Sequence, residues 1–303
     1  VKTGTKIGDA KAMCPGLILV SGHHRLYRHY HERVLEAVET VLPIEEVCSI
    51  DEMRFRLLGE ECEPEAARNL AQRMKAALRE HVGECLTCSV GIAPNPFLAK
   101  MGTELQKPDG LVVIEATDLP RRLHKLKLTD FTGINKRMQI RLNAAGIFTA
   151  EQLCAVSRDE LGRAFGSVIG ERWWYLLRGY DLPALKTHRR SLGHSHVLPP
   201  EQRTDQGCRE VLLRLLEKAA MRLRSEGLVA GTMDVAVKGF EKSWSAHIVL
   251  PGTHDTVALG EHLVRVWAER DFRRPRAVAV TFGDLTPREA VTPSLFDPLA
   301  DRT

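Results

Sequence analysis

The strongest constraint on the fold is a regular alternation of strand and helix patterns in the last third of the chain. Stretches rich in β-forming residues are expected as strands at 191–198, 231–238, 243–250 and 276–282. Amphipathic patterns predict helices at 204–226 and 256–268. The resulting order of strand, helix, strand, strand, helix, strand predicts a ferredoxin-like βαββαβ domain.

Two adjacent carboxylates, Asp51 and Glu52, stand in a stretch where apolar and polar residues roughly alternate. This alternation predicts a strand with one buried face. Neighbouring side chains on a strand point to opposite faces, so Asp51 would face a site that Glu52 reaches from the strand's end or around a bulge. Mg²⁺ takes such carboxylate oxygens together with phosphate oxygens. The alternative is an edge strand with two solvated acids.

The elements around this pair predict a small α/β domain with helices on one face. Helices are expected at 26–42 and 63–82, and a third helix, capped by Asn95, runs to residue 106. A strand at 86–92 is expected to pair with the Asp51 strand, and another strand follows at 111–114.

Charge is distributed unevenly along the chain, although the net charge is only +4. Residues 1–120 hold 14 basic and 18 acidic side chains, residues 121–190 hold 14 and 6, and residues 191–303 hold 15 of each. A basic middle segment beside an acidic one indicates a polyanion held near metal-binding carboxylates. A solvated basic surface is an equal alternative on charge alone.

Cysteine usage and hydropathy favour a cytoplasmic protein that does not enter a membrane. The chain has no run of eighteen apolar residues. Its seven cysteines are scattered and odd in number, which suits reduced thiols. Cys85 and Cys88 have metal-ligand spacing without a second pair, so buried thiols are favoured over zinc. His194 and His196 lack a third ligand, so a polar sheet face is favoured there.

The basic segment 121–180 predicts short helices separated by glycines. Its turn at Gly133 resembles a helix-hairpin-helix, a motif that offers backbone N–H groups and a helix N-terminus to a DNA phosphate. Asn135 stands where a second glycine is usual, and Asn tolerates positive φ better than most residues. Lys136 and Arg137 would add charge. A plain helical turn is the alternative.

Four stretches carry longer signatures. In chain order they are Val1 to Pro15, Ser49-Ile50-Asp51-Glu52, Cys88 to Lys100 (CSVGIAPNPFLAK), and Lys107-Pro108-Asp109-Gly110. Together they resemble the Y-family translesion DNA polymerases, the DinB/UmuC/ImpB group. The matches occur in the family's order, and later segments extend the resemblance over nearly the whole chain.

The resemblance implies an α+β multidomain protein. It has an α/β palm with partial fingers, a small helical thumb with a helix-hairpin-helix, and a ferredoxin-like little-finger domain. The implied boundaries are partial fingers 1–24, palm 25–120, thumb 121–180, linker 181–190, little finger 191–287 and tail 288–303.

The implied activity is template-directed DNA synthesis past damaged bases, in which a primer 3′-OH attacks the α-phosphate of a dNTP with the help of two Mg²⁺ ions. By resemblance, Asp51 and Glu52 are catalytic metal ligands, and Lys107 contacts the triphosphate with support from Lys100. From spacing alone, Lys107 would only complement a helix dipole. The expected contacts to primer–template DNA are Gly133, Asn135, Lys136, Arg137, Arg189 and Arg190.

The family has a first palm strand with another metal-binding Asp upstream of the segment that opens this chain. A Tyr and an Arg that hold the triphosphate also lie upstream in the family, and the sequence contains none of these elements. We therefore expect an N-terminally incomplete chain, inactive as a fragment although its parent is an enzyme.

The last residues suggest a further partner. Leu295 and Phe296 lie in a polar segment that resembles the bacterial sliding-clamp peptide, with Thr292 in place of the usual Gln. Exposed apolar pairs of this kind are anchors for a partner's pocket. Folding of the tail back onto the protein is the alternative.

Two further functions stay open at this stage. One is a non-catalytic Y-family-like DNA-binding accessory protein that docks on a sliding clamp or another polymerase. The other is a helix-hairpin-helix DNA-binding module without enzymatic history.

Overall fold

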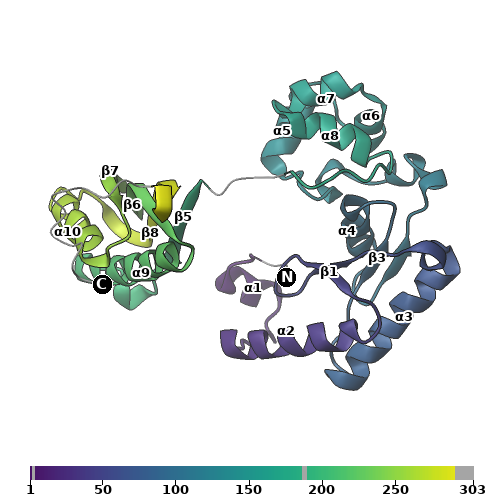
Figure 1. Ribbon diagram of the computed structural model, residues 1–303, viewed down its shortest axis with the longest axis horizontal. Coiled ribbons are helices and arrows are strands. Elements are labelled where there is room, and N and C mark those ends of the chain that lie inside the picture. The colour runs from purple at the N-terminus through teal and green to yellow at the C-terminus, as the bar shows by residue number, and fades with distance from the viewer. Residues whose placement is uncertain (2–3, 186–189, 291–303) are drawn as a thin grey trace. The chain divides into compact units, whose positions relative to one another are not determined.

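The computed structural model describes residues 1, 4–185 and 190–290. The chain divides into two compact units, Val1–Ala184 and Leu185–Thr303, which Figure 1 colours from purple to teal and from green to yellow. The division falls inside the segment 181–190 that the sequence predicts as a linker. The subdivision of the first unit into fingers, palm and thumb stays a prediction.

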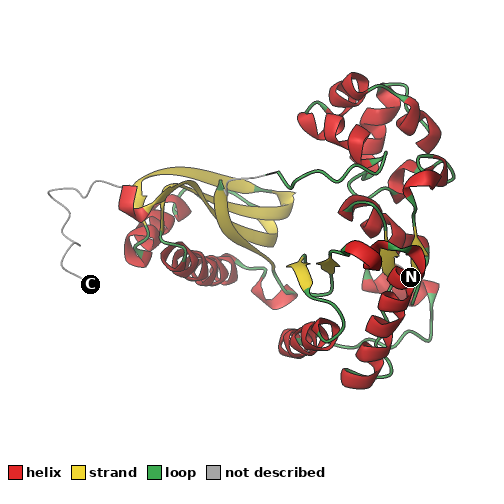
Figure 2. Ribbon diagram, turned by 45° about the vertical axis from the view of Figure 1, so that its right-hand side comes forward, coloured by secondary structure: helices red, strands yellow, loops and turns green. Residues whose placement is uncertain are grey.

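The second unit has the predicted order of elements. Its elements are β5 (Ser191–Val197), α9 (Asp205–Ser225), β6 (Leu228–Lys242), β7 (Trp244–Thr253), α10 (Thr256–Trp267) and β8 (Arg273–Pro287). The strands form one antiparallel sheet in the order β5-β8-β6-β7, visible in yellow in Figure 2. β6 and β8 occupy its centre and are longer than predicted.

Alternation along the central strands explains why both helices cover one face of this sheet. Met233, Val235 and Val237 of β6 are fully buried, and they share one core with Leu212 of α9 and Leu259 of α10. The residues between them on β6 point to the other face, on which no helix of the described residues 190–290 packs. The period-two pattern of β6 therefore matches a sheet that is covered on one side.

The first unit begins with helices around two small sheets. Its first elements are α1 (Ile7–Met13), α2 (His24–Glu39), β1 (Ile44–Val47), β2 (Met53–Phe55), α3 (Pro64–His81), β3 (Val90–Ile92), α4 (Pro96–Leu105) and β4 (Leu111–Val113). β1 and β2 form an antiparallel hairpin, whereas β3 and β4 pair in parallel. A short 3₁₀ helix, Gly59–Cys62, precedes α3.

The predicted pairing of 86–92 with the Asp51 strand is wrong. Only Val90–Ile92 is a strand, and its partner is β4. The reason is the helix between them: α4 leads the chain back so that β4 can lie parallel to β3, as a crossover connection requires. The hairpin β1–β2 instead packs its apolar side chains against Val38 of α2 and Leu78 of α3.

β3 and α4 approach each other very closely at two glycines. A Cβ atom on Gly91 would lie 2.0 Å from the carbonyl oxygen of Ala99, and one on Gly102 would lie 3.0 Å from the Cα of Gly91. Asn95 caps α4 as predicted, because its side-chain oxygen accepts from the Leu98 N–H at 2.9 Å. These contacts fix the helix that carries Lys100.

The rest of the first unit consists of short helices, as predicted. The α-helices are α5 (Lys136–Ala144), α6 (Ala150–Ala155), α7 (Arg158–Phe165) and α8 (Val168–Leu176), and 3₁₀ helices lie at Ala116–Asp118, Arg121–Leu123 and Leu128–Asp130. Their core is continuous with that of α4 and β4. The side-chain amide of Asn95 also donates to the carbonyl oxygens of Leu176 at 2.9 Å and Tyr180 at 3.1 Å.

Among the residues that the structure describes, no helix is both long and apolar enough to cross a bilayer.

Candidate active site and nucleic-acid interface

Asp51 lies in the turn between β1 and β2, so its predicted place on a strand is wrong. The ladder ends at the pair Val47–Met53, and the backbone N–H groups of Cys48 and Ser49 both donate to the carbonyl oxygen of Glu52. The Ser49 hydroxyl donates to Asp51 Oδ1 at 2.7 Å. Such local side-chain bonds compete with strand pairing and favour a turn. Both carboxylates are exposed at the tip of the hairpin.

A chain of ion pairs links this turn to the two lysines that the sequence predicts as nucleotide contacts. The Lys100 ammonium donates to Glu52, and it lies 3.4 Å from Glu104 Oε1. Lys107 Nζ donates to the same Glu104 oxygen at 2.7 Å. The structure therefore brings Glu52, Lys100 and Lys107 together, and Glu104 joins the two lysines.

The electrostatics of this chain favour the charged forms of Lys100 and Glu104. Burial opposes the charge of Lys100, but its hydrogen bond to Glu52 and the two neighbouring carboxylates outweigh burial and raise its pKa. The hydrogen bond from Lys107 lowers the pKa of Glu104, with help from Lys100. The sequence analysis did not single out Glu104. Its signal was spacing: it stands four residues after Lys100 on α4, which places the two on one side of the helix, and three residues before Lys107, which follows the end of α4.

The turn that carries Lys107 is anchored by a buried lysine. Lys75 of α3 donates to the carbonyl oxygens of Cys88 at 2.8 Å and Asp109 at 2.7 Å, and to Asp109 Oδ1 at 2.7 Å. Arg79 lies 3.3 Å from the other carboxylate oxygen. These bonds hold Asp109 at a φ of +54° and lower its pKa, chiefly through the hydrogen bond from Lys75. The sequence analysis missed Lys75, since its partner Asp109 lies 34 residues further along the chain.

The donor set at the turn fits a magnesium ion that shares its ligands with a nucleotide. Within the described ranges, no group of three or more His, Cys, Asp or Glu side chains could hold a metal by itself. Asp51 and Glu52 supply hard oxygen ligands at an exposed position, which suits Mg²⁺ because it binds through one or two carboxylates plus substrate phosphates.

A cavity of about 710 Å³ lies beside this ion-pair chain. Lys100, Glu104 and Leu105 of α4 line one side of it, and the loop 129–135 lines the other. The cavity therefore lies between Lys100 of the candidate nucleotide site and the turn that resembles a helix-hairpin-helix.

That turn differs from the prediction in its backbone. Gly133 has a φ of +99°, but Asn135 has a φ of −87° and needs no left-handed conformation. Asn135 is the N-cap of α5, and its side-chain oxygen accepts from the Met138 N–H at 2.9 Å. The element before the turn is only a 3₁₀ helix. Lys136 and Arg137 are exposed in the first turn of α5, where they could meet a phosphate.

The remaining predicted positions have different outcomes. Arg190 is exposed beside β5, whereas Arg189, Leu295 and Phe296 lie outside the described residues.

His196 is exposed, and within the described residues His194 Nε2 is buried without a hydrogen-bond partner. Burial, with the charges of Arg222 and Lys218, lowers the pKa of His194.

Cys85 is exposed, so its predicted burial in a strand is wrong. It precedes β3 and lies in the loop after α3. Trp173 is buried against Phe97 and Phe165.

Comparison with known proteins identifies the family. Residues 1–104 match the impB/mucB/samB family, and residues 189–295 match the C-terminal domain of that family. DNA polymerase IV of Moorella thermoacetica is 33% identical over 306 residues, covering 98% of this chain and 75% of the relative. DNA polymerase IV of Pelotomaculum thermopropionicum is 29% identical, covering 80% of this chain and 61% of the relative.

Solved structures show the same fold. A chimera of the Y-family DNA polymerases Dbh and Dpo4 superposes with a TM-score of 0.73 at 23% identity, covering 94% of this chain and 83% of the chimera. An insertion ternary complex of Dbh DNA polymerase has a TM-score of 0.54 at 24% identity, covering 93% of this chain and 83% of that one.

Fold and sequence matches together define a class of protein, the Y-family DNA polymerases. Within it, the chain belongs to the impB/mucB/samB family. The expectation of an inactive, N-terminally incomplete chain receives no support from these matches. The family match begins at residue 1, and the Moorella relative aligns over 98% of the chain.

Proposed function

We propose that this protein is a DNA-directed DNA polymerase that extends primers past damaged bases. The supporting observation is the ion-pair chain from Glu52 through Lys100 and Glu104 to Lys107, found in a member of the impB/mucB/samB family. It connects Lys100 and Lys107, the candidate phosphate contacts, with Glu52, one of the two candidate metal ligands. The relatives named above are DNA polymerases IV, and the protein would share their chemistry.

Asp51 and Glu52 would hold the divalent cations. Two bound Mg²⁺ ions would activate the attacking primer 3′-oxygen and stabilise the leaving pyrophosphate. Lys107 and Lys100 would exchange their carboxylate partners for the oxygens of the triphosphate, as lysines do at phosphate sites. Positioning and electrostatic stabilisation of this kind account for most of phosphoryl-transfer catalysis.

The two units would divide the DNA contacts. The turn at Gly133 with Lys136 and Arg137 would meet backbone phosphates in the thumb, residues 121–180. Arg190 and the neighbouring Arg189 would do so at the start of a ferredoxin-like little finger, residues 191–287. Contacts of this type position DNA without reading its sequence. The palm, residues 25–120, would hold the chemistry.

A second candidate is a non-catalytic DNA-binding accessory protein of the same family. One observation favours it: the described residues hold no three-carboxylate group, and Glu52 is paired with Lys100. The accessory protein would keep the basic thumb and the C-terminal sheet but would not extend primers.

Primer extension distinguishes the two candidates. The protein is incubated with Mg²⁺, dNTPs and primer–template DNA, with and without an abasic site in the template, beside an Asp51→Asn variant. The polymerase proposal expects extension by the unchanged protein and its loss in the variant, with DNA affinity equal in both. DNA binding without extension by either protein would favour the accessory role. Extension at an unchanged rate in the variant would remove Asp51 from the site.

The tail would tether the protein to a sliding clamp through Leu295 and Phe296. Tethering raises the effective concentration of a dissociating polymerase at its primer without any new active-site contact. Calorimetry of a clamp with a 289–299 peptide should show binding on the order of micromolar or weaker. Substituting both residues with Ala should abolish the heat. Equal heats from the two peptides would contradict this role.

A further inference from the structure

Near its end, β6 leaves its ladder with β8 and turns an aromatic side chain outward. The pairing shifts around Gly239, which faces Pro275, and Lys242, which faces Arg273. A Cβ atom on Gly239 would lie 2.0 Å from the carbonyl oxygen of Lys242, so the bulge has room only for glycine. Bulges re-aim the side chains beside them. Here the side chain is Phe240, which is 53% exposed.

Three arginines surround the ring of Phe240. Their guanidinium carbons lie 5.4 Å (Arg203), 5.6 Å (Arg274) and 5.9 Å (Arg276) from its centroid. All three distances are within the range of a cation–π interaction. Arg203 comes from the loop before α9, whereas the other two come from β8, so the fold gathers them from separate elements.

The positive charge of this cluster is only partly neutralised. Arg274 pairs with Glu241 at 3.2 Å. Arg203 donates through Nε to the carbonyl oxygen of Leu198 at 3.0 Å, and within the described ranges neither it nor Arg276 has an ion-pair partner. Like charges held this close repel unless an anion joins them. Arg274 also has a φ of +50°, a costly conformation for a residue of this kind, and such strain clusters at functional sites.

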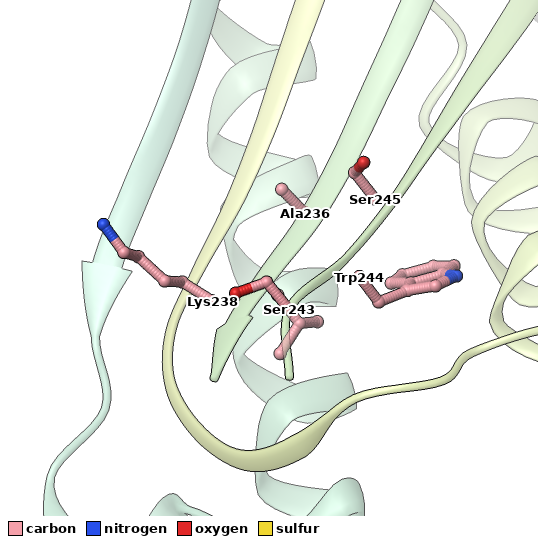
Figure 3. A pocket seen from close by; sticks show the side chains of 6 residues that line it. Ala236, Lys238, Ser243, Trp244 and Ser245 are labelled. Carbon is pink, nitrogen blue, oxygen red and sulfur yellow. The ribbon is translucent and has the colours of Figure 1, made fainter. Parts of the chain in front are cut away.

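The same end of the hairpin carries a shallow pocket. Ala236, Lys238, Ser243, Trp244 and Ser245 line it together with Val237, and its volume is about 300 Å³ (Figure 3). The Lys238 side chain extends away from Trp244 in this view, and Trp244 packs edge-on against Trp267. Lys238 therefore adds another exposed cation two residues before Phe240.

We infer that Phe240, Arg203 and Arg276 form a binding site for an unpaired nucleotide of single-stranded DNA. An exposed aromatic ring among guanidinium groups matches a nucleotide, because the ring stacks on the base and the cations take the neighbouring phosphates. Bases inside a duplex do not expose their faces, so the site selects unpaired DNA. This inference rests on the proposed function, because a template extending beyond its primer supplies such bases.

The test compares DNA with and without unpaired bases. A primer–template carries 2-aminopurine at successive positions of a template overhang, and a blunt duplex of equal length is the reference. The full chain should bind the overhang more tightly and should quench 2-aminopurine at one or two positions. Phe240→Leu should weaken overhang binding about tenfold and abolish the quenching, with blunt-duplex affinity unchanged. Phe240→Trp should retain the affinity for the overhang and the quenching of 2-aminopurine.

Phe148→Leu is the matched control, because Phe148 is 61% exposed and no arginine stacks on it in the described structure. If thermal unfolding shows that the Phe240→Leu protein does not fold, Arg276→Gln is tested in its place. Arg276→Gln should lower the affinity for the overhang and leave the affinity for the blunt duplex unchanged. If Phe240→Leu and Arg276→Gln bind the overhang as tightly as the unchanged protein, the inference is overturned and the proposed polymerase function is left intact. Absence of all DNA binding would overturn both.

Discussion

Gly91→Ala is the substitution by which the packing of the candidate active site can be tested most directly. Gly91 lies in β3 where α4 crosses it, and α4 carries Lys100 and Glu104. The added Cβ atom would lie 2.0 Å from the carbonyl oxygen of Ala99 and 2.8 Å from the backbone nitrogen of Thr103. Both atoms belong to the backbone of α4, so no side-chain rotation can relieve the contact.

The size of the effect follows from these distances. An ordinary carbon–oxygen contact is no shorter than about 3.4 Å, so α4 would have to move away from β3 by more than an ångström. Overpacking of a well-packed core costs about 1–3 kcal/mol, and a contact between two backbones belongs at the upper end of that range. For a unit of this size, about 3 kcal/mol lowers Tm by roughly 6–12 °C.

The assay is thermal unfolding of the full chain, followed by a titration that measures its affinity for a nucleotide. Gly260→Ala is the control, because Gly260 lies within α10, has no atom near its added Cβ, and gains helix propensity. Gly91→Ala should lower the transition of the first unit and weaken nucleotide binding. Gly260→Ala should raise or leave unchanged the transition of the second unit. A Gly91→Ala protein as stable as its parent would refute the close approach of α4 to β3.

Three further outcomes are expected. Glu104→Gln should raise the affinity for a fluorescent dNTP severalfold, because the carboxylate that competes with phosphate for Lys107 is gone; an unchanged or lower affinity would contradict this competition. Asp109→Asn should flatten the acid side of the stability–pH curve: the pKa of Asp109 is lowered, so its stabilisation is present above the ordinary value of 3.8 and is lost as the pH falls through the lowered pKa. Replacing Lys136 and Arg137 with Ala should reduce the salt slope of DNA binding by roughly one to two units in a filter-binding titration, and an unchanged slope would place the phosphate contacts elsewhere.

The C-terminal sheet was predictable because one of its faces is covered and the other is open. Burial on one face imposes a period of two, which the buried Val235 and Val237 of β6 display directly in the sequence. The ends of β6 and β8 were not predictable, since beyond Lys238 the pairing continues through a bulge with charged residues. The surroundings of Phe240 were not predictable either, because its arginine neighbours come from β8 and from the loop before α9.

The hairpin turn at Asp51 shows where pattern reasoning fails at the candidate active site. Alternation around Ser49 continued the strand pattern, but the backbone closes a turn on the carbonyl oxygen of Glu52. A strand would have separated the two carboxylates onto opposite faces, whereas in the turn Glu52 pairs with Lys100 and Asp51 accepts from the Ser49 hydroxyl. The roles of Asp51 and Glu52 therefore stay a prediction, and the turn changes only the geometry in which they would act.

The positions of the two lysines depend on partners that no local pattern reveals. Lys75 stands on α3, far from Asp109 in the sequence, yet its ammonium is nearly buried and donates to both the backbone and the carboxylate of that residue. An uncompensated buried cation would be costly, so Asp109 has to occupy this place for the first unit to pack. The pairing of buried Lys75 with the exposed Asp109 therefore helps to fix the turn that begins at Lys107. The exposed ion pairs that Glu104 makes with Lys107 and Lys100 are expected to be weak, as their proposed replacement by a triphosphate requires.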